Sequence, residues 1–301
     1  MKLCLGTVQF GMPYGIGNLT GQQPLRQDCF TMLDEAIVQG IDCIDTAFAY
    51  GEAEELLGEY GIGRKNVKVI SKLCPNIVER DEKDIQGILE RELKGSLQRM
   101  KLDSLDGYLF HTPEYITRPA VVEALLECKR KQLTKQVGVS VYEVEHAFCA
   151  LDIEGIDYIQ APFSILDQRM ERSGFLQKAK EKGITVFLRS AFLQGLFFIE
   201  PVNLPSRVEQ TRAQLAAVSA IVKEHGFSLA EAALRFVLET DADYLVFGVD
   251  TLGQLQENLR SFDSKSDFSA CRTALYNAFP EIDKSIIFPS LWKEKKVGRA
   301  R

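Results

Sequence analysis

The stretch that decides the fold is Gly40-Ile-Asp-Cys-Ile-Asp45-Thr46-Ala47-Phe-Ala-Tyr50-Gly51-Glu52-Ala-Glu54-Glu-Leu-Leu-Gly58. It opens with a short apolar run, Ile41–Ile44, which is typical of a buried β-strand, and a polar residue follows this run directly. Immediately upstream, apolar residues recur with helical spacing at Phe30, Leu33, Ala36 and Ile37. The stretch therefore predicts a strand that is preceded by an amphipathic helix.

The same pattern recurs along the whole chain. Short apolar or β-branched runs predict eight strands, at 2–5, 41–44, 67–70, 105–110, 136–139, 158–159, 185–188 and 244–247. Segments with helical spacing separate them, for example Ile85/Ile88/Leu89/Leu93/Leu97 and Leu215/Val218/Ile221/Val222. Alternating strands and helices predict a parallel sheet that is covered on both faces. A closed eight-stranded barrel and an open doubly wound sheet both satisfy this pattern.

Two observations favour the closed barrel. The strand count reaches eight without a Pro-rich linker or charge block, and about 250 residues or more is the usual size of a barrel domain. An open sheet would carry a glycine-rich phosphate loop, but Gly15-Ile16-Gly17 and Gly61-Ile62-Gly63 both lack the third glycine. We therefore predict a single (β/α)₈ barrel over residues 1–289, followed by a basic tail at 290–301 that we expect to be flexible.

Composition excludes several classes of function. The chain has 42 acidic and 36 basic residues and a net charge of −6, which predicts no general attraction to nucleic acid or to anionic membrane. Its seven cysteines are scattered and its three histidines lie far apart, so we expect free thiols and no metal site. The first residues lack the apolar core of a signal peptide, and no apolar run could span a bilayer. We expect a cytoplasmic protein; the sequence does not indicate its oligomeric state.

Polar residues follow nearly every predicted strand. In a (β/α)₈ barrel the active site lies where the strands end, so these residues are expected to converge at one mouth. They are Asp45, Ser71, Lys72, His111, Ser140, Gln160, Arg189 and Ser190. Each alone is more often a helix cap or a turn residue, and it is their convergence that predicts a site.

Four of the residues near this mouth could donate a proton to a carbonyl oxygen. A tyrosine has a pKa of about 10, and a neighbouring lysine cation lowers the cost of forming the phenolate. Tyr50, Lys72 and Asp45 could supply a proton donor, its cation and the carboxylate that keeps the cation charged. His111 could hold the carbonyl by a hydrogen bond. A cofactor would have to supply the hydride, because no side chain can.

The quoted stretch closely resembles the signature block of the aldo-keto reductases. Further blocks match in the family's order: Gly6-Thr7-Val-Gln-Phe10-Gly11, Ile70-Ser71-Lys72, Leu109-Phe110-His111, Val137-Gly138-Val139-Ser140, Gln160-Ala-Pro-Phe-Ser164 and Glu257-Asn258-Leu259. The resemblance covers nearly the whole chain. It implies a (β/α)₈ barrel and an NAD(P)H-dependent reductase of aldehydes, ketones or sugars.

The resemblance also implies roles for individual residues. Asp45, Tyr50, Lys72 and His111 match the catalytic tetrad, with Tyr50 as the general acid. Ser140 and Gln160 match residues that hold the nicotinamide carboxamide. The remaining residues expected to bind the cofactor are Gly6, Thr7, Asp45, Arg189, Ser190, Phe192, Gln194, Gly248, Gln254, Glu257 and Asn258.

Two departures from the family pattern lie near the expected nicotinamide. Val141 follows Ser140 where the family usually has Asn, which removes one amide contact. Arg189 occupies the position of an aromatic residue that stacks on the nicotinamide ring, and its positive charge would oppose the oxidised, cationic ring. We therefore hypothesise that Arg189 disfavours the oxidised cofactor. The alternative is that Arg189 turns away to pair with an acidic residue or to bind an anionic substrate.

Two other departures concern the cofactor's 2′-phosphate. Gly248 stands where many relatives have Lys, and Gln254 stands where many have Arg, while Asp250 would repel a phosphate if it faced one. Arg260 or Lys265 could compensate for the missing cations. Family habit makes NADPH the default expectation, with NADH second.

The substrate and the class of activity are less defined by sequence. The segments 12–23 and 197–207 are expected to line a partly apolar substrate pocket with Tyr14, Phe197, Phe198 and Pro205. The substrate is expected to be a small carbonyl compound, and a sugar or sugar-nucleotide carbonyl is attractive. Two alternatives remain open: a non-catalytic, cofactor-sensing member of the family, and a Schiff-base aldolase that uses Lys72.

Overall fold

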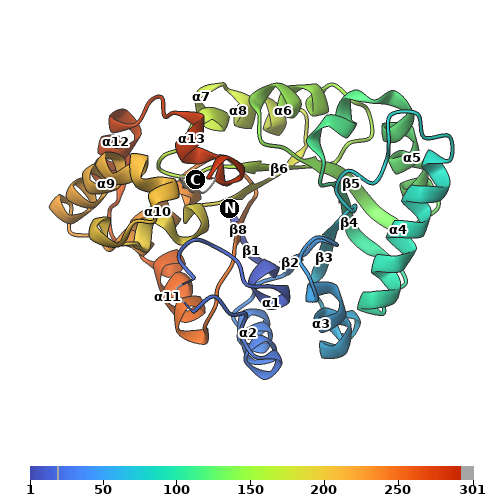
Figure 1. Cartoon of the computed structure of the whole chain (residues 1–301), viewed down its shortest axis with the longest axis horizontal. Coiled ribbons are helices and arrows are strands. Elements are labelled where there is room, and N and C mark those ends of the chain that lie inside the picture. The colour runs from blue at the N-terminus through green and yellow to red at the C-terminus, as the bar shows by residue number, and fades with distance from the viewer. Residues whose placement is uncertain (19, 293–301) are drawn as a thin grey trace, which may run out of the picture.

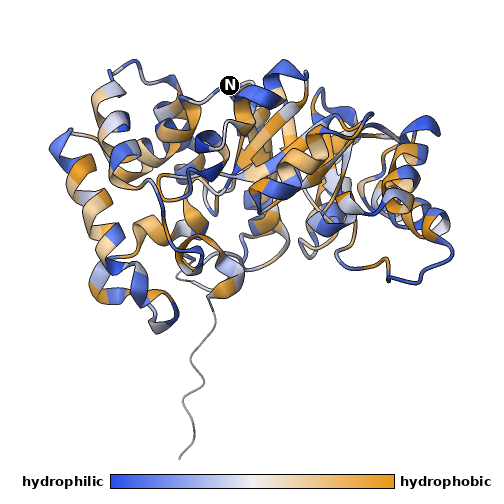
Figure 2. Cartoon of the chain, turned by 90° about the horizontal axis from the view of Figure 1, so that it is seen from above, coloured by the Kyte–Doolittle hydropathy of each residue, from blue (hydrophilic) through white to orange (hydrophobic). Residues whose placement is uncertain are grey.

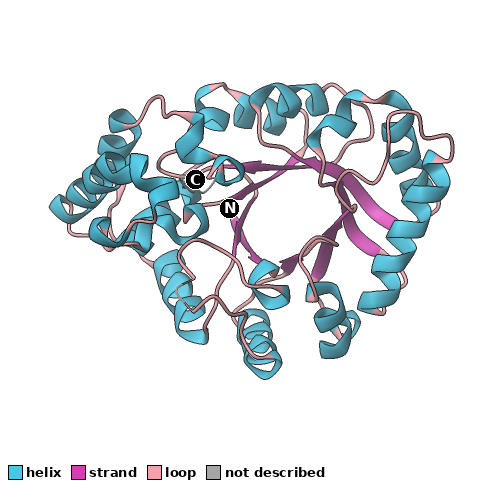
Figure 3. Ribbon diagram, in the orientation of Figure 1, coloured by secondary structure: helices cyan, strands magenta, loops and turns pink. Residues whose placement is uncertain are grey.

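The computed structural model describes residues 1–18 and 20–292, and within them the chain forms a closed, all-parallel barrel. The strands are paired in sequence order, and β8 closes the barrel by pairing with β1. Figure 3 shows them as a ring inside a layer of helices. The strands are β1 (Lys2–Gly6), β2 (Cys43–Asp45), β3 (Lys68–Lys72), β4 (Leu105–Phe110), β5 (Thr134–Ser140), β6 (Tyr158–Pro162), β7 (Thr185–Arg189) and β8 (Tyr244–Phe247). The predicted (β/α)₈ barrel is confirmed.

Helices connect the strands and cover the outside of the barrel (Figure 1). The α-helices are α1 (Val8–Gly11), α2 (Arg26–Val38), α3 (Ala53–Tyr60), α4 (Ile85–Met100), α5 (Pro119–Arg130), α6 (Val144–Leu151), α7 (Arg169–Arg172), α8 (Phe175–Glu181), α9 (Arg212–Glu224), α10 (Leu229–Leu238), α11 (Leu252–Asp263), α12 (Ser269–Ala278) and α13 (Lys284–Ile287). Short 3₁₀ helices are η1 (Ile62–Arg64), η2 (Pro113–Thr117), η3 (Leu193–Phe198), η4 (Pro201–Asn203), η5 (Ser206–Thr211) and η6 (Pro289–Leu291).

Capping residues define where several of the helices begin and end. The Asp84 side chain accepts a hydrogen bond from the Gly87 amide and so caps the start of α4. Ser228 and Thr251 cap α10 and α11 in the same way. Gly61, in the left-handed conformation at φ +77°, ends α3. These caps satisfy backbone groups that a helix end would otherwise leave without partners.

Two hydrophobic layers hold the barrel together. The larger layer lies between the strands and the surrounding helices and includes apolar residues of every strand. Inside the barrel lies a smaller cluster: Cys4, Cys43, Ile70, Leu109, Phe187, Tyr244 and Val246, with Tyr158 packed against it. The rings of Phe187 and Tyr244 stack at 4.6 Å between centroids. Figure 2 shows apolar strands enclosed by helices whose outer surfaces are hydrophilic.

Other expectations concern thiols, membranes and the chain end. All seven cysteines are free thiols, and five of them are buried. None of the helices in the described residues is long and apolar enough to cross a bilayer. The folded part extends past the predicted boundary at residue 289, because η6 continues to Leu291 and the Trp292 indole donates a hydrogen bond to the Ile286 carbonyl. The basic residues of the expected tail, from 293 onward, lie outside the described residues.

Candidate active site

The polar residues at the strand ends lie on the inner face of the barrel because of the two-residue period of β-strands. Cys43 and Ile70 belong to the inner cluster, and two residues further along their strands are Asp45 and Lys72. Side chains two apart on a strand point to the same side. His111 and Arg189 stand in the same relation to the cluster members Leu109 and Phe187, and Gln160 does so to Tyr158, which packs against the cluster. The predicted site residues therefore converge at the carboxyl end of the barrel.

Lys72 lies at the centre of this group. Its Nζ donates hydrogen bonds to both carboxylate oxygens of Asp45, each at 2.7 Å, and to the Thr46 carbonyl at 2.9 Å. It also donates to the Tyr50 hydroxyl oxygen at 3.3 Å. Both charged side chains are buried, with 0% of Lys72 and 3% of Asp45 exposed. Because an ammonium group can only donate, the Tyr50 proton remains free to be donated elsewhere.

The titration of this group follows from its burial. Burial raises the pKa of Tyr50, and the Lys72 cation opposes that increase. Burial also works to lower the pKa of Lys72, but attraction to Asp45 and Tyr50 outweighs it, so that the pKa of Lys72 is raised. At neutral pH the group therefore consists of a charged lysine and a protonated tyrosine.

Gln160 and Thr7 hold Asp45 in place. The Gln160 amide donates to Asp45 Oδ1 at 2.7 Å, and the Ser140 hydroxyl donates to Gln160 Oε1 at 3.4 Å. Thr7 is fully buried, and its hydroxyl donates to the Asp45 carbonyl at 3.1 Å. The direct contact between Gln160 and Asp45 was not predicted, because nothing in the sequence relates two side chains 115 residues apart.

His111 lies edge-on against Tyr50, with the ring centroids 5.9 Å apart and an interplanar angle of 89°. Burial, together with the smaller effect of the cations Lys72 and Arg189, lowers the pKa of His111 to about 3. The imidazole is therefore neutral at physiological pH. Its Nδ1 is buried and makes no hydrogen bond to the described residues.

Arg189 ends β7 and lies over the Tyr142 ring, with its guanidinium carbon 4.4 Å from the centroid. It donates to the Val141 carbonyl at 3.0 Å and to the Ser190 hydroxyl at 3.2 Å. Among residues 1–18 and 20–292 its guanidinium contacts these groups and forms no ion pair, so it does not turn away to an acidic side chain. Val141 itself is buried in the core and does not replace the family's amide in the pocket.

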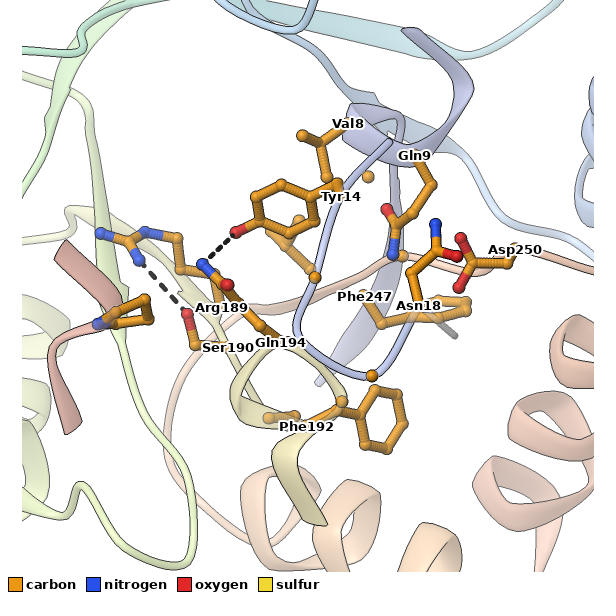
Figure 4. A pocket seen from close by; sticks show the side chains of 18 of the residues that line it. Val8, Gln9, Tyr14, Asn18, Arg189, Ser190, Phe192, Gln194, Phe247 and Asp250 are labelled. Atoms are coloured by element: carbon orange, nitrogen blue, oxygen red, sulfur yellow. Dashed lines mark hydrogen bonds between the residues drawn. The ribbon is translucent and has the colours of Figure 1, made fainter. Parts of the chain in front are cut away.

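The loop after β7 crosses one side of the pocket and meets the loop after β1 (Figure 4). The Gln194 amide donates to the Tyr14 hydroxyl at 3.0 Å, and the Gly17 amide donates to the Gln194 carbonyl at the same distance. Ser190 has a φ of +72°, an unusual conformation for a serine, which turns the chain at the end of the strand. Phe192 also faces the pocket from this loop.

Residues after β8 form the other end of the pocket. The Gln254 side chain accepts a hydrogen bond from the Asp250 amide at 2.7 Å, and the Gln254 amide donates to the Thr251 cap at 3.2 Å. A Cβ added to Gly248 would lie 2.2 Å from Gln9 Oε1. The Gln9 side chain therefore fills the space that a larger residue at position 248 would need. Glu257 and Asn258 line the same end from α11.

A pocket of about 890 Å³ joins these parts. It extends from Tyr50 and His111 to the first turns of α11, and nearly all predicted catalytic and cofactor-binding residues line it. The exceptions are Thr7 and Lys72, which lie beneath its wall. The sequence did not predict several lining residues, which lie on short helices or at the start of a helix rather than at strand ends: Gln9, Ser228, Ala230, Pro289 and Ser290.

The predicted substrate loops contribute only in part. Tyr14 and Phe198 line the pocket as expected. Phe197 does not, because it is buried in the hydrophobic core, and Pro205 is not among the lining residues. In this segment the predicted apolar character was correct, but the direction of each side chain could not be read from a non-repeating loop.

Together, the fold and the site define a class: a (β/α)₈ barrel with a buried Asp–Lys–Tyr group at its carboxyl mouth. The sequence matches the profile of the Aldo/keto reductase family over residues 2–275, and the chain belongs to this family of oxidoreductases.

Individual relatives agree with this assignment. The chain is 27% identical to protein tas of Escherichia coli (strain K12), with 82% of this chain and 88% of that protein covered. It is 31% identical to the NADH-specific methylglyoxal reductase of the same organism, over 57% of this chain and 58% of that protein. The solved structure of aldo-keto reductase AKR11C1 from Bacillus halodurans (holo form) is similar in fold, with a TM-score of 0.74, 21% identity and coverage of 97% and 95%.

Proposed function

We propose that the protein reduces the carbonyl group of an aldehyde, ketone or sugar to an alcohol, with a nicotinamide dinucleotide as hydride donor. The observation that carries this proposal is the Tyr50 hydroxyl, which borders the pocket and receives a hydrogen bond from the buried Lys72 cation. A hydroxyl in this position is suited to protonate an oxygen that develops negative charge.

Two properties of the pocket suit a dinucleotide: its volume, and buried polar atoms that have no hydrogen-bond partner among the described residues. Ligand pockets usually measure roughly 300–1,000 Å³, and this one measures about 890 Å³. Gln9 Oε1 and Asp250 Oδ1 are buried and have no hydrogen-bond partner in the described residues. Such atoms normally find partners, which suggests that a bound molecule supplies them.

Different residues along the pocket would contact different parts of the dinucleotide. Ser140 and Gln160 would hold the carboxamide beside Tyr50, and Asn258 with Glu257 would hold the adenosine end. Ser190, Phe192 and Gln194, on the loop between, would contact the pyrophosphate. When bound, the dinucleotide supplies a hydride to the carbonyl carbon.

Tyr50 and its neighbours handle the proton. Tyr50 stays protonated at neutral pH because burial raises its pKa. As it gives up the proton, the negative charge on its oxygen forms 3.3 Å from Lys72 Nζ. Lys72 remains charged through Asp45, whose two oxygens each accept from it. The developing phenolate is thus stabilised by a cation already in position.

His111 is suited to hold the carbonyl oxygen rather than to carry charge. Its pKa of about 3 keeps the ring neutral, so it can donate one hydrogen bond without competing with Tyr50 for the proton. The edge-on contact with Tyr50 brings both rings to the same end of the pocket. Two donors that converge on one oxygen would orient the carbonyl for reduction.

The same geometry disfavours the aldolase alternative. A Schiff base requires a neutral lysine amine. The pKa of Lys72 is raised through Asp45 and Tyr50 despite its burial, and its ammonium group is engaged by three different acceptor groups. Lys72 is therefore better suited to stabilise a charge than to attack a carbonyl.

A turnover screen tests the proposal. Purified protein is mixed with reduced dinucleotide and a panel of aldehydes, ketones and sugars, beginning with methylglyoxal, and the loss of reduced-nicotinamide absorbance is followed. Oxidation that depends on a carbonyl compound supports the proposal. Tight dinucleotide binding without turnover of any compound would overturn it in favour of a cofactor-sensing role. A substrate adduct trapped on Lys72 by borohydride would overturn it in favour of an aldolase.

A further inference from the structure

We propose that the pocket selects a dinucleotide with a free ribose 2′-hydroxyl over one with a 2′-phosphate, and that Asp250 makes this distinction. In cofactor terms the protein prefers NADH to NADPH, the reverse of the family default. This inference rests on the proposed function, because it assumes that the nicotinamide lies beside Tyr50 and the adenosine therefore at the opposite end.

The charges in the pocket are divided between its two ends. Arg189 is the only lysine or arginine among the described residues that line the pocket, and it lies at the end near Tyr50 and His111. The opposite end carries two carboxylates, Asp250 and Glu257. Figure 4 shows Arg189 and Asp250 on opposite sides of the pocket. A 2′-phosphate would thus meet like charge where the adenosine is expected.

Asp250 has an oxygen that is ready to accept a hydrogen bond. Its Oδ1 is buried, with no partner in the part of the chain that the structure describes, and burial raises the pKa of the carboxyl group. A ribose hydroxyl can donate to this oxygen, whereas an ionised phosphate can only accept. Replacing the hydroxyl with phosphate would exchange a hydrogen bond for the repulsion between two anions.

Backbone donors nearby are already in use. The Asp250 amide donates to the Gln254 side chain, and the Gln254 amide donates to the Thr251 hydroxyl. The Gln254 side chain is thereby turned to the backbone. Two amides that could otherwise bind a phosphate at the start of α11 are therefore occupied.

The cations expected to compensate lie elsewhere. Neither Arg260 nor Lys265 is among the lining residues of the pocket, and Arg260 borders a separate surface groove with Glu35 and Asp263. Asn258, by contrast, lines the pocket, is only 5% exposed and forms no side-chain hydrogen bond with the described residues. This end of the pocket thus offers an amide and carboxylates, a set suited to adenosine hydroxyls and ring nitrogens.

Fluorescence titration of the purified protein with NADH and with NADPH tests the inference. We expect NADH to bind at least about tenfold more tightly, which corresponds to roughly 1.4 kcal/mol. In competition experiments 5′-AMP, which has a free 2′-hydroxyl, should bind more tightly than 2′,5′-ADP, which has a 2′-phosphate. Neither compound contains nicotinamide, so this comparison tests the adenosine end alone. Raising the ionic strength should reduce the ratio of NADH affinity to NADPH affinity, since salt screens the repulsion between the 2′-phosphate and Asp250.

Substitutions assign the preference to one residue. Asp250→Asn keeps the size of the side chain and removes its charge, so NADPH should bind several-fold more tightly and NADH no better than before. Asp263→Asn makes the same charge change at the exposed far end of α11, about 20 Å away at 1.5 Å per helical residue. This control should leave both affinities unchanged.

The outcomes separate this inference from the proposed function. If NADPH binds as tightly as NADH, or if Asp250→Asn and Asp263→Asn change the ratio equally, the inference is wrong while the proposed function stands. If neither dinucleotide binds, the proposed function itself is wrong.

Discussion

At the scale of single residues, the buried ion pair of Asp45 and Lys72 dominates the site. Taking two charges out of water is costly, and the attraction between them repays that cost only when the geometry is good. Here Lys72 contacts both oxygens of Asp45, and the Gln160 amide adds a further hydrogen bond. The buried ion pair is therefore held in one geometry, and each charge is tolerated in the interior only while the other is present.

Removing one partner should therefore destabilise the whole protein. Lys72→Met leaves Asp45 charged and buried, and we expect the free energy of unfolding in urea to fall by about 3–5 kcal/mol. The double variant Asp45→Asn with Lys72→Met should recover part of that loss. Lys180→Met breaks the exposed pair with Asp241 and should leave the free energy of unfolding almost unchanged, because solvent screens such pairs. An equal loss in both lysine variants would contradict the burial argument.

His111 should make stability depend on pH. Its pKa falls from the usual 6.5 to about 3 on folding, chiefly through burial. As pH falls from 6.5 towards 3, the unfolded chain takes up a proton that the folded protein does not. The free energy of unfolding is therefore unaffected by His111 above pH 6.5. Below pH 6.5 the titration of His111 lowers it by about 1.4 kcal/mol per pH unit.

The difference between wild type and His111→Asn isolates this effect, because titrating groups common to both proteins cancel. Between pH 7 and pH 5 the wild type should lose roughly 2 kcal/mol more in free energy of unfolding than the variant. Urea unfolding at both pH values gives the comparison. Parallel losses in the two proteins would mean that His111 titrates normally in the folded state.

At the scale of elements, the turn that carries Tyr50 depends on close backbone contact with α1. The Gly11 carbonyl accepts a hydrogen bond from the Glu52 amide at 3.1 Å. A Cβ on Gly11 would lie 1.8 Å from the Tyr50 carbonyl oxygen, and one on Gly51, whose φ is +58°, would lie 2.2 Å from the Gly11 carbonyl. Only glycine allows this approach.

Gly11→Ala should therefore displace the Tyr50 turn. The obstructing atoms belong to the backbone, so we expect a loss of at least about 1–3 kcal/mol in stability, as in overpacked cores, together with reduced turnover. Gly253→Ala is the matched control, because its Cβ would meet nothing closer than Thr251 Oγ1 at 3.8 Å and lies in an exposed helical turn. Thermal unfolding that is unchanged in Gly11→Ala would rule out the close contact.

The elements themselves could largely be predicted from the sequence. Every predicted strand is present, and β4 and β8 have the predicted bounds. Others extend beyond the apolar run into polar residues, as β7 does to Arg189, because ladder hydrogen bonds do not require an apolar side chain. Short helices such as α1 and α7 were not predicted, since one turn leaves no period to detect.

At the scale of the whole molecule, the pocket is assembled from segments that span the chain from Gly6 to Ser290. Residues at strand ends could be predicted, because their direction follows from the two-residue period. Contacts between loops could not, and these include the Gln194–Tyr14 hydrogen bond and the way Gln9 fills the space beside Gly248. The proposed cofactor preference depends on a loop residue, Asp250, whereas three of the four residues proposed to handle the carbonyl and the proton lie at or directly after strand ends.

The central claim is that Tyr50 donates the proton in carbonyl reduction. The most direct measurement compares Tyr50→Phe with wild type, both for turnover of the best carbonyl substrate and for affinity for reduced dinucleotide. Loss of a positioned general acid typically costs about 10²–10⁴ in rate, so we expect turnover to fall by that factor while dinucleotide affinity stays unchanged. Full turnover by Tyr50→Phe would contradict the account.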